Sequence, residues 1–266
     1  MTEGFVFGDE KIALENEILR SVVGSELVGL SLGEASDRDE MGIYIETPEQ
    51  LLGIQPSSEH YISRTKPTGE RSGPGDLDLT LYSLRKWMRL ACDGNPTVLQ
   101  ILFSPYEFVL NETNEGYNLR HLVTEYILSQ KVGARHLGYL DGQRERMIGG
   151  GSRRRVPNRP ELVEQFGYDT KYASHALRLG YQGYELLTTG ALSLPMKEPF
   201  LRTCLMVKRG EVDFTTALEM VDEAREYLHE AIHLPSQLLP PEPSMECVNR
   251  WMVRLTNAHW GIFTDD

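Results

Sequence analysis

The sequence predicts an α+β fold, with a small mixed β-sheet and its helices in residues 1–110 and an all-helical domain in residues 111–266. Two runs in the first part, residues 37–45 and 76–82, have the lengths and residue patterns of β-strands. From residue 117 onward, apolar residues recur at spacings of three and four, which is typical of amphipathic helices. The first part is therefore expected to be of α/β type, and the rest of the chain to pack as helices.

The overall composition is that of an ordinary globular protein. Of 266 residues, 40% are hydrophobic and 25% are charged, so the chain is long enough to bury a full core. The formal net charge of −12 argues against a surface that coats nucleic acid broadly, because such a surface needs clustered lysine and arginine. A local basic groove is compatible with this charge, since a few cations are enough to hold a nucleotide.

The sequence shows no sign of a membrane or secretory segment. No stretch approaches the roughly 18 apolar residues that a membrane helix needs, and the acidic N-terminus lacks the basic start of a signal peptide. Cys92, Cys204 and Cys247 are odd in number and far apart, which indicates buried, reduced thiols rather than a zinc site or a disulfide framework. We expect a cytoplasmic protein with no membrane partner.

The first part of the chain opens on a helical pattern. Residues 10–22 have the spacing of a helix that packs on a sheet, and Val22–Ser25 reads as a short strand that runs into a turn. Residues 47–75 are rich in proline, glycine, serine and charge, so we interpret residues 64–75 as a solvated connection between strands. The strand at 76–82 leads into a helix that ends near Gly94, and Asn95-Pro96 starts a helix over residues 97–102.

The second part reads as a series of helices. One or two are expected in residues 117–140, and residues 161–189 form either one long helix or two with a bend at Gly167. Further helices are predicted at about residues 200–209, 214–233 and 246–257, and the proline-rich residues 234–243 connect the last two.

Three aspartates belong to the predicted strands. If Asp37 and Asp39 open the strand that continues to Ile45, the period of two puts both carboxylates on one face. Asp78, in the strand at 76–82, would add a third carboxylate from a neighbouring strand. Carboxylates held side by side repel one another unless a cation lies between them, and oxygen ligands suit Mg²⁺. The pattern predicts a site for two metal ions of the kind that serves phosphoryl displacement.

The order Gly24-Ser25, Ser36-Asp37-x-Asp39 and a later strand acid at Asp78 resembles the nucleotidyltransferase superfamily related to DNA polymerase beta. Residues 78–103 and 166–190 are similar to its bacterial and phage branch, a predicted RNA-repair-pathway nucleotidyltransferase family. The resemblance covers most of the chain. It implies a catalytic domain in residues 1–110 and a helical domain in residues 111–266 that closes the cleft for nucleotide and acceptor.

The resemblance also implies roles for single residues. The aspartates Asp37, Asp39 and Asp78 would be the catalytic residues and would ligate two Mg²⁺ ions, with Mn²⁺ as an alternative. Asp78 would also help to deprotonate the attacking hydroxyl. The contacts to the triphosphate of an NTP such as ATP would come from Gly24, Ser25 and Ser36.

Basic side chains gather in the second part. Seven arginines surround a glycine-rich stretch at residues 149–152, namely Arg135, Arg144, Arg146, Arg153, Arg154, Arg155 and Arg159. Further along, Lys171, His175 and Arg178 fall at i, i+4 and i+7 on one helix face, and we predict that they contact the nucleotide or the acceptor. The glycine-rich stretch beside Arg153–Arg155 indicates a flexible segment that could close on a polyphosphate or an RNA backbone, and the alternative is a solvated surface loop.

The resulting hypothesis is an enzyme that moves a nucleoside monophosphate from an NTP to an acceptor hydroxyl and releases pyrophosphate. The family points to RNA or tRNA as the acceptor, and a protein or a small molecule is the alternative. A second hypothesis is a nucleotide-binding module without turnover. A third is a metal-dependent phosphohydrolase, against which the Gly-Ser turn and the lack of clustered histidines argue. The sequence assigns no oligomeric state.

Overall fold

The computed structural model describes residues 4–33, 37–54, 57–67, 69–148, 159–234 and 238–262. The chain divides into two compact units by its contacts. The first consists of Met1–Cys92, Thr97–Ile127 and Pro243–Asp266, and the second of Asp93–Pro96 and Leu128–Glu242. Residues 111–127 and the last helix thus group with the sheet rather than with the other helices of the C-terminal part.

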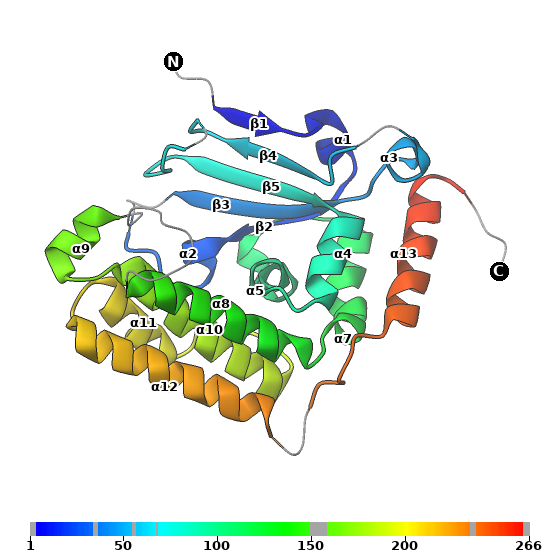
Figure 1. Ribbon diagram of the computed structural model, residues 1–266. Helices are drawn as coiled ribbons and strands as arrows, with labels where there is room; N and C mark the ends of the chain where they lie inside the picture. The colour runs from blue at the N-terminus through cyan, green and yellow to red at the C-terminus, as the bar shows by residue number, and fades with distance from the viewer. Residues whose placement is uncertain are drawn as a thin grey trace. The chain divides into compact units, whose positions relative to one another are not determined.

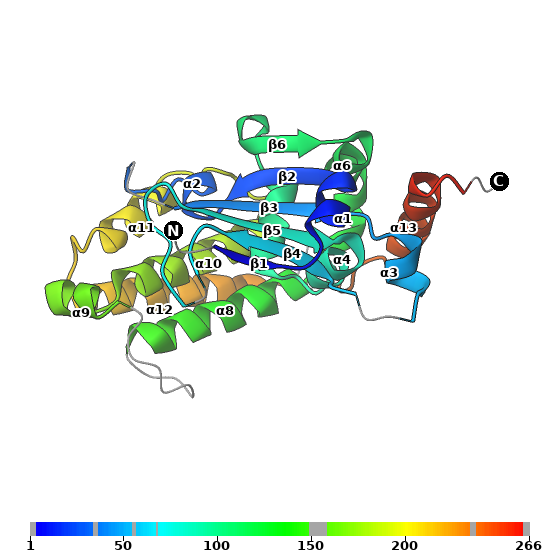
Figure 2. The same cartoon turned by 90° about the horizontal axis from the view of Figure 1, so that it is seen from above.

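The first unit is built on a six-stranded mixed sheet. Its strands are β1 (Phe5–Phe7), β2 (Glu17–Val23), β3 (Arg38–Tyr44), β4 (His60–Arg64), β5 (Leu77–Ser83) and β6 (Val109–Glu112). Their order is β1-β4-β5-β3-β2-β6. Figure 1 shows this order from β1 to β2, and Figure 2 shows β6 beside β2. Strands β3 and β5 run parallel, and the other neighbours are antiparallel. The mixed sheet confirms the predicted α+β class.

The helix expected over residues 10–22 is shorter than predicted. The structure has α1 at Glu10–Glu15 and then enters β2. Six of the seven β2 residues are buried, so this strand is covered on both faces and shows no alternation of apolar and polar residues. A buried strand of this kind is hard to distinguish from a helix by periodicity, which explains the error.

Helices of the first unit flank the sheet and connect its strands. They are α2 (Gly24–Leu27), α3 (Pro48–Leu52), α4 (Leu84–Cys92), α6 (Asn114–Asn118), α7 (Thr124–Ile127) and α13 (Met245–His259), with α5 (Pro96–Leu99) at the boundary. Single 3₁₀ turns at Gln100–Phe103 and Tyr106–Phe108 precede β6, and a π-helical turn at Leu119–Val123 joins α6 to α7. The helix after Ser83 and the short helix after Asn95-Pro96 were both expected.

The core of the first unit lies on the central strands. Leu19 on β2, Ile43 on β3 and Leu81 on β5 are completely buried. On β5 the buried positions alternate with half-buried ones up to Ser83, as the period of two predicts. Because β3 and β5 are held in register by this core, the ends at which they begin are fixed beside each other.

The second unit is helical. Its helices are α8 (Lys131–Met147), α9 (Pro160–Phe166), α10 (Thr170–Thr189), α11 (Phe200–Lys208) and α12 (Phe214–Ile232), of which α8, α10 and α12 pack on one another (Figure 1). Gly167 ends α9 with a φ of +81°, so the segment forms two helices with a break at this glycine. Gly180 lets α10 approach α12 closely, since a Cβ there would lie 2.9 Å from the carbonyl oxygen of Ala224.

None of the helices in the described ranges is long and apolar enough to cross a membrane. Of the cysteines, Cys92 and Cys204 are buried and Cys247 is half-buried, and no disulfide joins them in the described part of the chain. Burial raises the pKa of the Cys204 thiol to about 12. These findings agree with the inert, mostly buried thiols that the sequence indicates.

Candidate active site

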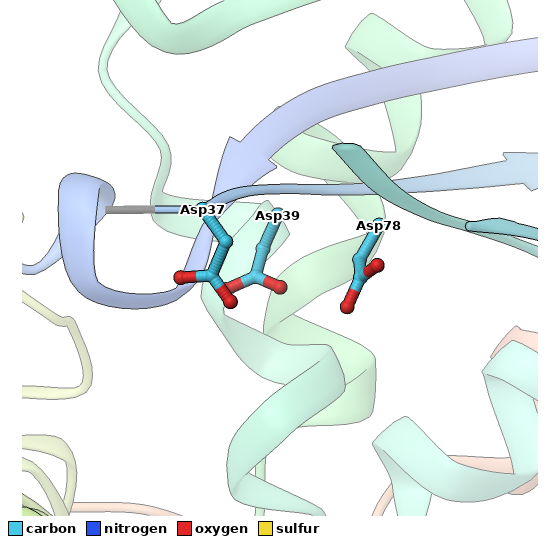
Figure 3. Close-up of side chains that lie close together, drawn as sticks. All are labelled: Asp37, Asp39 and Asp78. Carbon is cyan, nitrogen blue, oxygen red and sulfur yellow. The ribbon is translucent and has the colours of Figure 1, made fainter. Parts of the chain in front are cut away.

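The three predicted aspartates lie together at one end of the parallel strand pair. Asp39 on β3 and Asp78 on β5 are direct register partners, and Asp37 comes two residues before Asp39. The backbone N–H of Arg38 donates to the carbonyl of Asp76 at 2.9 Å, which ties the two strand starts to each other. Figure 3 shows the three side chains pointing to the same side of this strand pair. The convergence that the sequence predicts is therefore present in the structure.

The geometry of these carboxylates fits a divalent cation. Asp37, Asp39 and Asp78 are half-buried, and each offers an oxygen within 4.8 Å of the oxygens of the other two. Like charges at this distance are unfavourable unless a cation lies between them. Carboxylate oxygens are hard ligands of the kind that Mg²⁺ prefers. The donor set and its spacing are therefore those of a site for a hard divalent cation.

Asp78 is held by an arginine and a serine that sequence reasoning did not single out. Arg64 of β4 lies opposite Asp78 in the antiparallel register and donates from Nε to Oδ1 at 3.0 Å and from Nη2 to Oδ2 at 2.9 Å. Ser72 Oγ lies 2.9 and 3.0 Å from the two oxygens of the same carboxylate, and Arg64 Nη2 also donates to this hydroxyl at 3.1 Å. A carboxylate accepts about four hydrogen bonds, and the single hydroxyl proton of Ser72 serves one oxygen at a time, so these contacts orient Asp78 and use most of its acceptor positions.

The three carboxylates raise the pKa of Arg64. Its pKa is raised, first by the hydrogen bond to Asp78 and then by the charges of Asp78, Asp39 and Asp37, while partial burial acts in the opposite direction. The guanidinium therefore stays charged, and its charge interacts with all three carboxylates. In this position it offsets part of their mutual repulsion.

The turn at Gly24-Ser25 lies directly beside Asp39. Val23, the last residue of β2, is the register partner of Asp39, so the chain turns into α2 next to this carboxylate. Gly24 has a φ of +69°, and a Cβ at this position would lie 2.3 Å from Asp39 Oδ2. Only glycine combines this backbone conformation with so close an approach. Ser25 follows it and is half-buried.

The loop between β4 and β5 takes part in the site, although its composition indicated a solvated connection. Besides Ser72, it holds Asp76, whose Oδ2 accepts the backbone N–H of Gly73 at 2.9 Å and lies 3.7 Å from Lys66 Nζ. These bonds order the turn that leads into β5. Arg64 can be recognised only from the register in which β4 pairs with β5, because this register places it opposite Asp78. The composition of the loop does not contain this information.

The other predicted contacts lie on α10 in the second unit. Lys171 is exposed, whereas His175 and Arg178 are half-buried and contact each other, with His175 Nε2 2.6 Å from Arg178 Nη2. All three belong to the face that the spacing predicted. Ser36 and Arg153–Arg155 lie outside the described residues.

The arginine-rich stretch divides into two groups. Arg135 pairs with Asp93, and Arg144 pairs with Asp222 at 2.5 Å, so both contribute to ion pairs within the second unit. Arg146 and Arg159 instead lie over the ring of Tyr172, with their guanidinium carbons 5.8 and 5.3 Å from its centroid. The four described arginines of this stretch therefore fall into two pairs, one bound to carboxylates and the other stacked on Tyr172.

Three comparisons with known proteins show what the chain is similar to. The RNA repair pathway DNA polymerase beta family matches residues 11–233. An uncharacterised 38.9 kDa protein from the nrdC-mobD intergenic region of Enterobacteria phage T4 is 34% identical over 93 residues, which are 35% of this chain and 27% of that protein. The crystal structure of a nucleotidyltransferase-like protein from Exiguobacterium sibiricum aligns with 84% of this chain and 71% of that chain, at 13% identity and a TM-score of 0.28. The match over most of its length shows that the chain belongs to the RNA repair pathway DNA polymerase beta family.

Proposed function

We propose that the protein is a metal-dependent nucleotidyltransferase that moves a nucleoside monophosphate from an NTP to the hydroxyl of an RNA or tRNA end and releases pyrophosphate. The family suggests nucleotidyl transfer in general terms. The observation that carries the proposal is the convergence of Asp37, Asp39 and Asp78 from two parallel strands, with oxygens within 4.8 Å of one another.

The aspartates would hold two Mg²⁺ ions, with Mn²⁺ as an alternative. Bound there, the ions would offset the charge of the triphosphate and lower the pKa of the acceptor hydroxyl. Asp37, directly before β3, and Asp39 on β3 would provide ligands, and Asp78 would provide a ligand from β5. Asp78 would also accept the proton of the attacking hydroxyl, and Arg64 and Ser72 fix its orientation for this role.

The turn at Gly24-Ser25 would position the triphosphate. Its backbone lies against the carboxylate of Asp39, so phosphate oxygens that share a cation with Asp39 would lie close to this turn. Ser36 was expected to contribute as well and lies outside the described residues. In the second unit, Lys171, His175 and Arg178 would bind charged groups of the nucleotide or the acceptor.

RNA or tRNA is the acceptor that the family favours. The net charge of −12 disfavours a long duplex, because duplex binding needs many phosphate contacts. A short RNA or the end of a tRNA requires far fewer. We therefore propose that the acceptor hydroxyl belongs to an RNA end.

Transfer of a labelled nucleotide tests this function. The purified protein is incubated with Mg²⁺, total RNA and each of the four NTPs, labelled either at the α- or at the γ-phosphate. We expect RNA to acquire the α-label and never the γ-label, because pyrophosphate leaves. The variant with Asp37→Asn and Asp39→Asn should lose at least roughly a thousandfold in rate, since metal ligation supplies several kcal/mol of charge stabilisation.

Other results would assign other functions. Label on protein, or on a small molecule added in place of RNA, would retain nucleotidyl transfer and replace the acceptor. A rise in melting temperature with NTP but no transfer to any acceptor would instead identify a binding module. Release of inorganic phosphate without label transfer would identify a phosphohydrolase.

A further inference from the structure

A cluster of cationic groups surrounds Tyr172 at the start of α10. Arg146 at the end of α8 and Arg159 before α9 both lie over the Tyr172 ring, at 5.8 and 5.3 Å from its centroid. The other members come from the exposed or half-buried face of α10 itself. We call this set the Tyr172 cluster, and it consists of Arg146, Arg159, Lys171, Tyr172, His175 and Arg178.

The cations of the cluster all act on the imidazole of His175. Its pKa is lowered well below the usual value, first by burial and then by the charges of Arg178, Lys171, Arg146 and Arg159. Four cations therefore act on a single imidazole. Like charges gathered in this way raise the free energy of the ligand-free protein.

Asp169 lies beside the cluster, and both of its oxygens already have partners. Asp169 is the N-cap of α10, and its Oδ1 accepts the backbone N–H groups of Lys171 and Tyr172, each at 3.1 Å. Its other oxygen lies 3.4 Å from Arg159 Nη1. Among the described residues, no carboxylate forms an ion pair with Arg146, Lys171 or Arg178. The cluster thus carries an excess of positive charge in a chain whose net charge is −12.

Arg178 is the buried guanidinium of the cluster. Burial lowers its pKa to about 10, and the side-chain partner that it has is His175 Nε2 at 2.6 Å. A guanidinium only donates hydrogen bonds, so His175 Nε2 must accept and the imidazole must be neutral. A partly desolvated guanidinium is normally paired with a carboxylate or a phosphate, because burial of an unpaired charge is costly.

We propose that the Tyr172 cluster is a preformed binding site for a phosphate group with at least two negative charges, and that it binds this group without a divalent metal. The Tyr172 ring would hold the guanidinium groups of Arg146 and Arg159 in place, and Arg178, held by neutral His175, would donate to phosphate oxygens. The source of the phosphate is either the triphosphate of the NTP or the terminal phosphate of the RNA. This inference deepens the proposed function and rests on it for the identity of these two sources.

Calorimetric titration with inorganic tripolyphosphate in EDTA tests the site. Without divalent metal, the aspartates cannot contribute, so any binding is independent of the proposed active site. We expect saturable binding of one tripolyphosphate per chain. Arg146→Gln and Lys171→Gln, which change exposed side chains, should each weaken it on the order of tenfold, the value of one charge-assisted hydrogen bond. Arg178→Lys should also weaken it, because lysine cannot reproduce the planar donor arrangement.

Arg144→Gln is the matched control. Arg144 lies on α8 two residues before Arg146 and pairs with Asp222, so the variant removes the same charge outside the cluster. Binding should be within twofold of the wild type. An equal loss of tripolyphosphate affinity in Arg144→Gln and Arg146→Gln would overturn the proposal. Absence of tripolyphosphate binding in EDTA would overturn it as well.

Two further titrations distinguish the sources of the phosphate. If ATP competes with tripolyphosphate in EDTA, and an oligoribonucleotide with a terminal phosphate does not, the site belongs to the NTP. If the phosphorylated oligoribonucleotide competes and the same oligonucleotide with hydroxyl ends does not, the site belongs to the RNA end. Failure of nucleotidyl transfer together with intact tripolyphosphate binding would reject the proposed function and retain the site.

Discussion

Arg64 and Asp78 face each other across the antiparallel strands β4 and β5 and form a two-point ion pair, with distances of 3.0 and 2.9 Å. The pair lies at the edge of the group of three carboxylates, and Ser72 bridges its two members. A cation supplied by the protein therefore already contacts one of the proposed metal ligands. We infer that Arg64 positions Asp78 and reduces the repulsion among the aspartates when no metal is bound.

We predict that Arg64→Gln lowers nucleotidyl transfer by about 10- to 100-fold, the usual effect of removing a partner that orients a metal ligand. The free energy of unfolding should fall by less than about 1 kcal/mol, because both side chains are partly exposed and such ion pairs are weak. Rates at varied Mg²⁺ concentration and urea denaturation measure the two effects. Arg64→Lys keeps the charge and should recover part of the Mg²⁺ affinity. An unchanged Mg²⁺ dependence in Arg64→Gln would show that the ion pair has no positioning role.

The close approach of Gly24 to Asp39 leads to a second prediction. Gly24→Ala would place a methyl group 2.3 Å from Asp39 Oδ2 at a φ of +69°. We expect a loss of more than about 1 kcal/mol in unfolding free energy, since alanine is unfavourable at positive φ, and a loss of metal affinity because the carboxylate must move.

Gly33→Ala separates these two effects. Gly33 also has a positive φ, of +100°, but a Cβ there meets nothing within 4 Å. The control should therefore lose stability and retain metal affinity. If Gly24→Ala binds Mn²⁺ as tightly as Gly33→Ala does, the contact with Asp39 is not important for the site.

His136 gives the second unit a predictable response to acid. The side chain is buried within α8, its Nδ1 lies 2.7 Å from the carbonyl oxygen of Val132, and burial lowers its pKa from 6.5 to about 4. The imidazole of His136 takes up a proton more readily in the unfolded chain than in the folded protein. The free energy of unfolding is therefore unaffected by His136 above about pH 6.5 and decreases as the pH falls towards 4. The effect is on the order of 3 kcal/mol.

Urea denaturation at pH 7.5 and at pH 5 measures about 2 kcal/mol of this contribution, because pH 5 is still above the folded-state pKa of about 4. The wild type should lose stability between the two conditions, and His136→Gln should lose clearly less because its side chain does not titrate. Equal losses in the two proteins would mean that carboxylates alone determine the acid response.

The sequence predicted the elements that have a strong local pattern. The strand at Asp78 alternates, and Gly167 marks a helix end, so both were predicted without the structure. Strand β2 was mistaken in part for a helix because both of its faces are buried. The pattern of apolar and polar residues identifies a strand or helix only when one face is buried and the other is exposed.

Some residues of the candidate site could likewise be predicted from the sequence, and others could not. Asp37, Asp39 and Asp78 could be predicted because short acidic patterns at strand starts are visible in the chain. Arg64 and Ser72 could not, since their contact with Asp78 depends on the register of β4 against β5 and on the path of the loop between them. The pairing of Arg146 and Arg159 with the Tyr172 ring likewise depends on how the helices pack.

The central claim is that Asp37, Asp39 and Asp78 bind divalent ions together, and Mn²⁺ binding measured by electron paramagnetic resonance tests it most directly. In the presence of a non-hydrolysable NTP, the wild type should bind two Mn²⁺ ions per chain, and Asp39→Asn should lose both. Glu70→Gln, which removes an exposed acid of the β4–β5 loop outside the group, should bind as the wild type does. Equal Mn²⁺ binding by Asp39→Asn and the wild type would contradict the account.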